Sequence, residues 1–279
     1  MTPPSIPLGT GDEMAALKAR QKATWEAGDF GEIARYSVPS AEEFMARLPL
    51  RPGLRVLDAA CGTGNLAVIA ARGGAIVHGL DLASNLVVQA RARAADEGLF
   101  IEYTEGDAEA MPYPNASFDL VVSMYGVMFA PRPEVVAEEL FRVTKPGGLV
   151  ALANWTPEGF IGQMFEVFKA HLPPPPTGVP SPLLWGDESA TRARLQEFSE
   201  VRCARRVARL RYPFSPAETV EFFRNYYGPT RRAFEMLPPS GQAALRRAME
   251  ELQAAGNVSP APGQTEVHAE YLEVLARKG

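Results

Sequence analysis

The stretch "VLDAACGTGNLA", residues Val56–Ala67, decides the fold. A short apolar run ends at Asp58, and Gly62 and Gly64 follow within a few residues. Glycine permits a tight turn and lets a ligand approach the backbone closely. A helix that begins at Asn65 would point its free N–H groups into the same space. The stretch therefore predicts a strand, a glycine turn and a helix with a ligand site at the turn, the alternative being a turn with a purely structural role.

Similar apolar runs recur along the chain and are separated by helical segments. This alternation is typical of βαβ units, which build a parallel sheet with helices on both faces. We therefore expect an α/β, Rossmann-like, seven-stranded and mostly parallel sheet. Its first five strands are predicted at Leu54–Ala59, Ala75–Asp81, Ile101–Asp107, Phe118–Met124 and Gly148–Trp155, and the helices between them at Asn65–Arg72, Ser84–Glu97 and Pro133–Val143.

The segments that flank this core are expected to belong to the same single domain, residues 1–279. Residues 1–45 form a predicted helical cap, residues 46–156 the ligand-binding core, and residues 157–279 the substrate side. Within the cap we expect an amphipathic helix at Glu13–Ala27 and a short helix at Ala41–Leu48. On the substrate side the expected elements are a helix at Glu158–Leu172, an extended proline-rich loop at Leu172–Pro182, the last two strands at Val201–Tyr212 and Thr265–Ala276, and between them an insertion of two helices at about 216–255, expected to form a lid.

Composition excludes several classes of protein. The net charge of −5 over 279 residues argues against a general nucleic-acid binder. Seven arginines between Arg192 and Arg211 invite that interpretation, or contact with an anionic substrate group, but they also suit an edge strand protected by charge. Cys61 and Cys203 make no disulfide scaffold, and no metal-ligand spacing is present. No secretory signal or apolar run of about 20 residues occurs, so we expect a cytoplasmic protein that is not bound to membranes.

The ligand at the glycine turn is indicated by its neighbouring acid. "GTGNLA" matches the dinucleotide pattern G-x-G-x-x-[GA], which is weak by itself. Asp58 stands where a pyrophosphate would have to lie, and two like charges would repel each other there. A ligand with a positive amino group and a positive sulfonium is favoured instead. S-adenosylmethionine (SAM) is such a ligand.

"VLDAACGTGN" resembles motif I of the class I SAM-dependent methyltransferases, with Ala60 and Cys61 as tolerated departures. The resemblance covers roughly residues 41–155 and is nearest to small-molecule enzymes such as the ubiquinone and menaquinone C-methylating type. It implies SAM as the cofactor and S-adenosylhomocysteine (SAH) as its product. Four further blocks follow in family order: "GLDLA" (79–83), "EGDAEAMPY" (105–113), "FDLVVSMYGVMF" (118–129) and "FRVTKPGGLVAL" (141–152).

The resemblance also assigns roles to residues of the cofactor site. Asp81 would accept hydrogen bonds from the ribose hydroxyls, because a carboxylate can accept from both. Asp107 would accept from the adenine amino group, and the Ala108 N–H would donate to a ring nitrogen. The full set of expected cofactor-binding residues is Asp58, Ala60, Gly62, Gly64, Asn65, Asp81, Leu82, Asp107, Ala108, Met124 and, from the cap, Tyr36.

Aromatic residues that follow the strand ends predict an apolar chamber for the methyl acceptor, although packing in the core is the alternative for each. His268 is the candidate general base, since the start of an antiparallel last strand would lie at the cofactor edge. His78 and His171 are expected to be structural, and Cys61 a small filler. The expected chamber residues are Tyr125, Met128, Phe129, Trp155, Phe160, Phe222 and Tyr226.

These observations predict transfer of a methyl group to a small, apolar or aromatic molecule by direct in-line displacement. The acceptor atom (O, N, C or S) and the oligomeric state stay open. One alternative is a SAM-binding protein that transfers nothing and has a regulatory or interaction role. A second is a nicotinamide-dependent oxidoreductase, which is disfavoured because no Tyr-x-x-x-Lys pair is present to supply a proton.

Overall fold

Seven strands form one sheet in the order β3-β2-β1-β4-β5-β7-β6 in the computed structural model, which describes residues 11–176 and 178–279. The first five strands are parallel, whereas β7 runs antiparallel to both β5 and β6. This arrangement confirms the expected seven-stranded, mostly parallel sheet. The strands are β1 Arg55–Ala59, β2 Ile76–Asp81, β3 Ile101–Glu105, β4 Phe118–Met124, β5 Thr144–Trp155, β6 Glu200–Tyr212 and β7 Thr265–Arg277.

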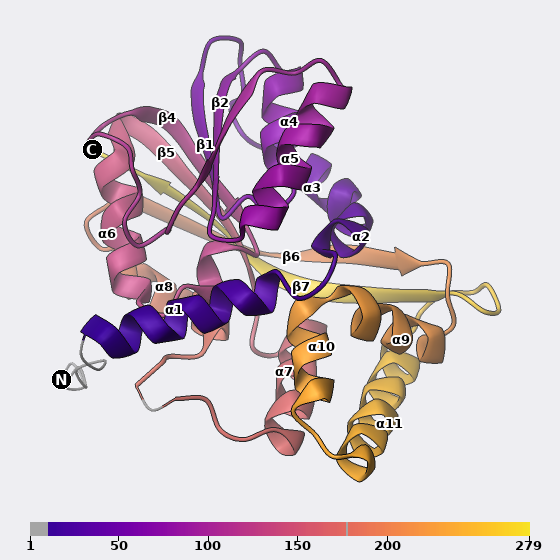
Figure 1. Cartoon of the computed structure of the whole chain (residues 1–279). Coiled ribbons are helices and arrows are strands. Elements are labelled where there is room, and N and C mark those ends of the chain that lie inside the picture. Colours follow the sequence, from indigo (N-terminus) through magenta and orange to yellow (C-terminus); the bar gives the residue numbers. More distant parts are fainter. Residues whose placement is uncertain (1–10, 177) are drawn as a thin grey trace.

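Helices surround the sheet, with α4 and α5 on one side of the strands and α6 on the other (Figure 1). The order of the strands in the sheet reverses direction between β1 and β4. Open α/β sheets bind ligands in the crevice at such a reversal. Helix α1 crosses the molecule beside this crevice (Figure 1). The first helices are α1 Gly11–Trp25, α2 Phe30–Ala34, α3 Val38–Ala46, α4 Asn65–Arg72, α5 Ser84–Asp96, α6 Pro133–Val143 and α7 Phe160–His171.

Burial explains why the central strands read as almost continuous apolar runs. Every residue of β5 from Gly148 onward is buried, and β4 is buried except at Asp119 and Met124. Strands covered by helices on both faces need apolar side chains in both directions. Helix α1 differs from the expectation of an amphipathic helix, because none of its residues is buried.

The insertion at 216–255 folds into three helices rather than the expected two. The chain turns at Tyr227 and restarts at Gly228, where Pro229 lies in the first turn of the next helix. A Cβ at Gly228 would lie 2.0 Å from the Thr24 carbonyl oxygen, so this break packs closely against the end of α1. The insertion has a small core of its own around Phe234 and Leu245. The remaining α-helices are α8 Glu188–Arg194, which no sequence pattern predicted, α9 Pro216–Tyr226, α10 Gly228–Glu235 and α11 Pro239–Gly256.

Arginines of the edge strand β6 pair with glutamates of β7. Arg211 contacts Glu266 at 2.9 Å, and Arg205 contacts Glu270 at 2.8 Å. Both arginines are therefore paired within the hairpin that β6 and β7 form. No helix in residues 11–176 and 178–279 combines the length and the apolarity that a bilayer span requires.

Candidate functional site

A pocket of about 1100 Å³, counting the space at its open mouth, lies at the carboxyl ends of β1, β2 and β4. The glycine turn and the segments after β2, β3 and β4 form its floor and walls. Helices α1 and α2 contribute the remaining side. Chain segments that lie far apart in the sequence therefore meet at the crevice predicted from the order of the strands.

The glycine turn between β1 and α4 has the left-handed backbone that its sequence suggests. Ala60, Gly62 and Gly64 all have positive φ, at 54°, 55° and 81°. A Cβ at Gly64 would lie 2.3 Å from the Tyr103 hydroxyl oxygen, so only glycine fits there without rearrangement. Gly64 does not line the pocket, because it packs against Tyr103. Its role is to shape the turn that presents Gly62.

Asp58 is buried at the start of this turn and is 2% exposed. Its Oδ2 accepts a hydrogen bond of 2.9 Å from the backbone N–H of Ala67, in the first turns of α4. Burial raises the pKa of Asp58 to about 8, and the nearby Asp81 carboxylate adds to the rise. A cationic ligand in the pocket would favour the ionised form of Asp58 and lower this pKa.

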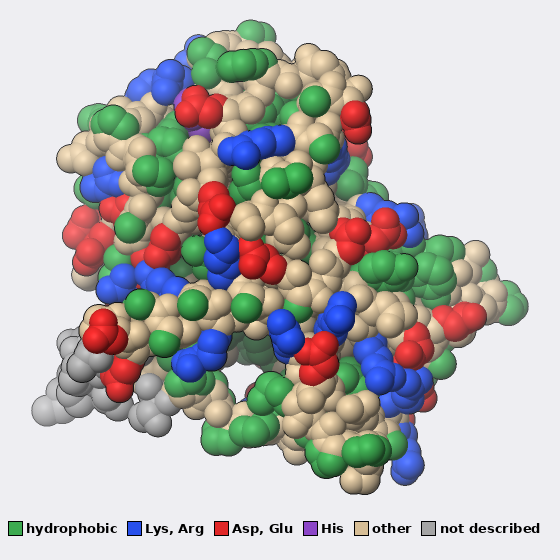
Figure 2. Space-filling view, in the orientation of Figure 1, with side chains coloured by type: hydrophobic (Ala, Val, Ile, Leu, Met, Phe, Trp, Pro, Cys, Tyr) green, Lys and Arg blue, Asp and Glu red, His purple; other side chains and the backbone are tan. Residues whose placement is uncertain are grey.

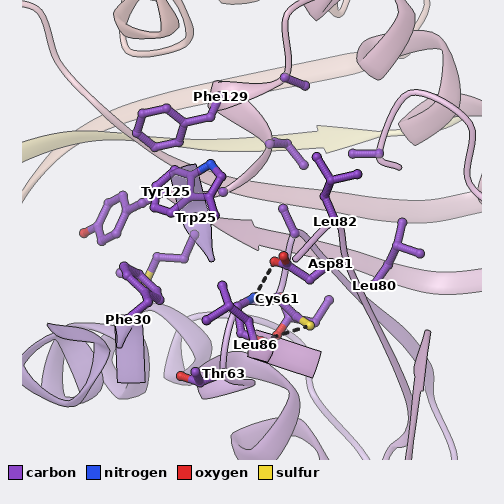
Figure 3. A pocket seen from close by; sticks show the side chains of 18 of the residues that line it. Trp25, Phe30, Cys61, Thr63, Leu80, Asp81, Leu82, Leu86, Tyr125 and Phe129 are labelled. Atoms are coloured by element: carbon purple, nitrogen blue, oxygen red, sulfur yellow. Dashed lines mark hydrogen bonds between the residues drawn. The ribbon is translucent and has the colours of Figure 1, made fainter. Parts of the chain in front are cut away.

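Asp81 ties the end of β2 to the glycine turn. Its Oδ2 accepts from the Gly62 N–H at 2.7 Å (Figure 3). Its Oδ1 accepts from the Ala83 N–H at 2.9 Å. Burial raises the pKa of Asp81, while the backbone N–H groups oppose that rise. Each carboxylate oxygen keeps one further acceptor position, which suits a ligand with two adjacent hydroxyls.

Asp107 follows β3 and is contacted by a lysine of the N-terminal helix. Its Oδ1 accepts from the Glu109 N–H at 2.8 Å, and its Oδ2 lies 2.5 Å from Lys18 Nζ. Lys18 also pairs with the buried carboxylate of Glu109, which accepts from the backbone N–H and the Nε of Arg132 at 2.6 Å each. The carboxylates of Asp107 and Glu109 are thus partly neutralised by cations from α1 and from the loop before α6.

Aromatic rings form the opposite side of the pocket. Trp25 lies edge to face with Phe129 at 5.0 Å and with Phe30 at 5.8 Å between ring centroids. Tyr125 also lines the pocket and stacks on Trp155 at 3.6 Å. Tyr125 has a positive φ of 59°, an uncommon conformation for a large residue. Figure 3 shows the labelled rings on one side and Asp81, Leu82 and Cys61 on the other.

Most of the expected cofactor residues line this pocket, and two of the expected chamber residues do so as well. They bring together the glycine turn, the ends of β2 and β4 and the segment after β3. The lining residues that the sequence predicted are Asp58, Ala60, Gly62, Asn65, Asp81, Leu82, Asp107, Ala108, Met124, Tyr125 and Phe129.

The other expected site residues do not line the pocket, because they pack elsewhere. Met128 is buried in the main core, and Trp155 lies behind Tyr125. Tyr36 and Phe222 pack against each other and against Tyr212. In addition, Phe160 packs near Gly256, Tyr226 is partly exposed, and the insertion at 216–255 contributes no lining residue to this pocket.

His268 also lies away from the pocket. It sits on β7 opposite Arg209 of the edge strand, and its side chain is 47% exposed. Its Nε2 is 3.3 Å from Glu266 Oε1. The strand is antiparallel as expected, but the pairing register directs this histidine toward the surface rather than toward the cofactor edge.

The N-terminal helices α1 and α2 contribute lining residues that the sequence does not predict. No local sequence pattern marks these contributions, because an apolar helix position such as Trp25 and a lysine such as Lys18 are equally typical of a surface helix that lines no pocket. Small and apolar residues of the turns were missed as well. The unexpected lining residues include Lys18, Gln21, Trp25, Phe30, Ala34, Ser37, Cys61, Thr63, Leu66, Leu80, Leu86, Gly106, Gly126, Val127, Ala130 and Pro131.

Known proteins share this domain. A family described as a methyltransferase domain matches residues 57–152. The uncharacterized protein Rv1405c of Mycobacterium tuberculosis is 36% identical over 247 residues, 87% of this chain and 90% of that protein. A malonyl-[acyl-carrier protein] O-methyltransferase of Enterobacter lignolyticus is 35% identical over 143 residues, 51% of this chain and 54% of the enzyme.

The YcgJ protein of Bacillus subtilis has a similar structure, with a TM-score of 0.59 at 16% identity over 86% of this chain and 98% of that chain. The sheet order and this structural similarity show a Rossmann-like fold of the class I methyltransferase type, and residues 57–152 match the methyltransferase domain. The chain belongs to the same family as the mycobacterial protein Rv1405c.

Proposed function

We propose that this protein uses SAM to methylate a small, apolar or aromatic molecule by direct in-line displacement, and that SAH is the product. One observation carries the proposal. Carboxylates from the ends of β1 and β2 and from the segment after β3 line one pocket beside a glycine turn. A cation with a ribose and an adenine presents complementary groups to these three positions and favours the ionised form of Asp58, whereas a pyrophosphate would favour its neutral form and gain no attraction there.

Each acidic residue has a distinct binding role in this proposal. Asp81 accepts from the ribose hydroxyls with the acceptor positions that Gly62 and Ala83 leave free. Asp107 accepts from the adenine amino group, and the Ala108 N–H donates to the ring. Asp58 balances the positive charges of the methionine end and, by accepting from Ala67, keeps the turn in place.

SAM, when bound, supplies a methyl group on a positively charged sulfur that is already activated for displacement. The chain then has to orient the acceptor and exclude water. Trp25, Phe30, Tyr125 and Phe129 provide an apolar wall for both tasks. This wall supports an apolar or aromatic acceptor, because a charged acceptor would lose its hydration without gaining a partner there.

Calorimetric titrations of the protein with SAH and, separately, with NADH test the cofactor. We expect SAH to bind with a micromolar dissociation constant and NADH to produce no saturable heat. Saturable NADH binding with no SAH binding would favour the oxidoreductase instead. SAH formation across a panel of phenols, amines, thiols and carbon acids then separates an enzyme from a SAM-binding protein that transfers nothing.

A further inference from the structure

Helix α1 lies over the pocket and is held there in an unusual way. Lys18, Gln21 and Trp25 line the pocket, yet no residue of Gly11–Trp25 is buried. The apolar side chains of the helix do not gather on one face. Burial of apolar surface, which normally docks a surface helix, therefore contributes little along most of its length.

Charged groups hold the helix along the adenosine side of the pocket. Lys18 pairs with Asp107 at 2.5 Å and with Glu109, and Lys22 pairs with Glu105 at the end of β3. Figure 2 shows basic and acidic side chains side by side where this helix meets the rest of the molecule.

The chain just beyond the helix continues the same line of contacts. The Glu26 carboxylate accepts from the Ser84 N–H at 3.1 Å and from the Ser84 hydroxyl at 2.8 Å, at the start of α5. All these partners surround the positions at which the proposed function places adenine and ribose. The contacts therefore run along the cofactor rather than along the acceptor.

The carboxyl end of the helix is anchored differently. The Trp25 ring packs against Phe30 and Phe129 and, at 5.9 Å, against Tyr227. The Asp29 N–H donates to the Tyr226 carbonyl at 3.0 Å. One end of α1 is thus fixed by aromatic packing, and its middle is fixed by ion pairs that can open without breaking a core.

We propose that α1 is part of the cofactor site and closes over the adenosine, with Lys18 and Lys22 as positioning residues whose ion pairs must open for the cofactor to exchange. The inference rests on the proposed function, because it takes Asp107 as the adenine acceptor. In this structure Lys18 occupies the Asp107 oxygen that is not used by the Glu109 N–H. The adenine amino group would compete with the Lys18 ammonium for this oxygen, so opening of the Lys18–Asp107 pair eases entry of adenine, and the pair of Lys18 with Glu109 holds the helix over the site.

Closure by these ion pairs predicts that the rate of cofactor release depends on salt. The side chains of Lys22 and Glu105 are 31% and 48% exposed, and those of Lys18 and Asp107 are 16% and 28% exposed. Salt screens exposed charges, so it should weaken these pairs and speed release of the cofactor. Attraction between a cationic ligand and the carboxylates of the pocket would appear in the rate of association, which salt slows, and SAH lacks the sulfonium charge that this attraction needs.

The test measures the rate at which SAH leaves the full-length protein, by tryptophan fluorescence in a chase with excess SAM. Lys18→Met together with Lys22→Met keeps both side chains long and unbranched, one atom shorter than lysine, and removes their charge. Arg20→Met is the matched control, since Arg20 is exposed on the same helix and makes no ion pair with a described residue. Thermal melts of all three proteins confirm that they are folded.

We expect the rate of SAH release to rise with salt in the wild type. In the double variant it should be about tenfold faster and nearly independent of salt, while Arg20→Met should behave as the wild type. Release from the double variant at the wild-type rate, or slower wild-type release at higher salt, would overturn the proposal. A wild type that binds no SAH in calorimetry contradicts the proposed function itself, and so separates the two failures.

Amide hydrogen exchange supplies a second readout. Residues 11–25 should exchange more slowly when SAH is bound to the wild type, and this protection should be lost in the double variant. Equal protection in the two proteins would show that the lysines do not hold the helix over the cofactor, and would overturn the assignment even if the rates differed.

Discussion

Asp81→Asn separates the two roles that the structure gives to this carboxylate. Both Asp81 oxygens accept backbone N–H groups, from Gly62 and from Ala83. An amide has only one oxygen, so one N–H would face an NH₂ group and lose its acceptor. A hydrogen bond to a charged group contributes about 1.5–3 kcal/mol. Removal of a buried charge offsets part of this loss, and we expect the free energy of unfolding to fall by about 1–2 kcal/mol.

We expect Asp81→Asn to lower the favourable free energy of cofactor binding by more than it lowers the free energy of unfolding. One of the two acceptors for the ribose hydroxyls disappears together with its charge, at a cost of about 1.5–3 kcal/mol. This corresponds to a dissociation constant for SAH about tenfold to a hundredfold higher. Calorimetry measures that constant, and urea unfolding followed by circular dichroism measures stability.

Asp119→Asn is the matched control. The Asp119 carboxylate also accepts a backbone N–H, from Arg55 at 2.9 Å, and it pairs with Lys145 at 2.8 Å. Asp119 lies near the amino end of β4, whereas the pocket lies at the carboxyl ends of the strands. This variant should lose comparable stability and bind SAH as the wild type does. Unchanged SAH affinity in Asp81→Asn, or an equal loss in both variants, would refute the reasoning.

Three further predictions follow from other parts of the site. Gly64→Ala should destabilise the protein by about 2–4 kcal/mol, from left-handed backbone strain and overlap with the Tyr103 hydroxyl, and Tyr103→Phe should restore part of that loss in urea unfolding. The raised pKa of Asp58 contributes stability that is fully present below about pH 4 and is lost as pH rises through about 8. The Tm of the ligand-free protein should therefore fall more steeply between these pH values than the Tm of Asp58→Asn. Parallel Tm profiles of the two proteins would contradict this prediction. Phe129→Leu should raise the KM for the acceptor about tenfold, because it removes a ring from the apolar wall, and should leave SAH affinity within about twofold in the same preparation.

The half of the pocket that lies at the strand ends is readable from sequence because its geometry is local. Asp58, Gly62 and Asp81 lie at strand ends, and parallel strands bring such ends to one edge of a sheet. A hydrophobic run followed by an acid or by glycines therefore locates each residue. Positions such as Trp155 were misplaced because a residue at a strand end can lie behind the pocket wall as readily as in it.

The position of helix α1 beside the pocket is not readable from sequence in the same way. The contacts of α1 join Lys18 and Lys22 to acids more than 80 residues further along the chain. A lysine paired at such a distance has the same sequence pattern as one in solvent. The extra break at Gly228 likewise depends on close packing against Thr24, which no local pattern reports.

A crystal structure of the protein with SAH bound tests the central claim most directly. We predict that SAH lies in this pocket with its ribose hydroxyls on Asp81, its adenine amino group on Asp107 and its sulfur directed toward Tyr125. SAH found outside this pocket, or with its ribose away from Asp81, would contradict the account.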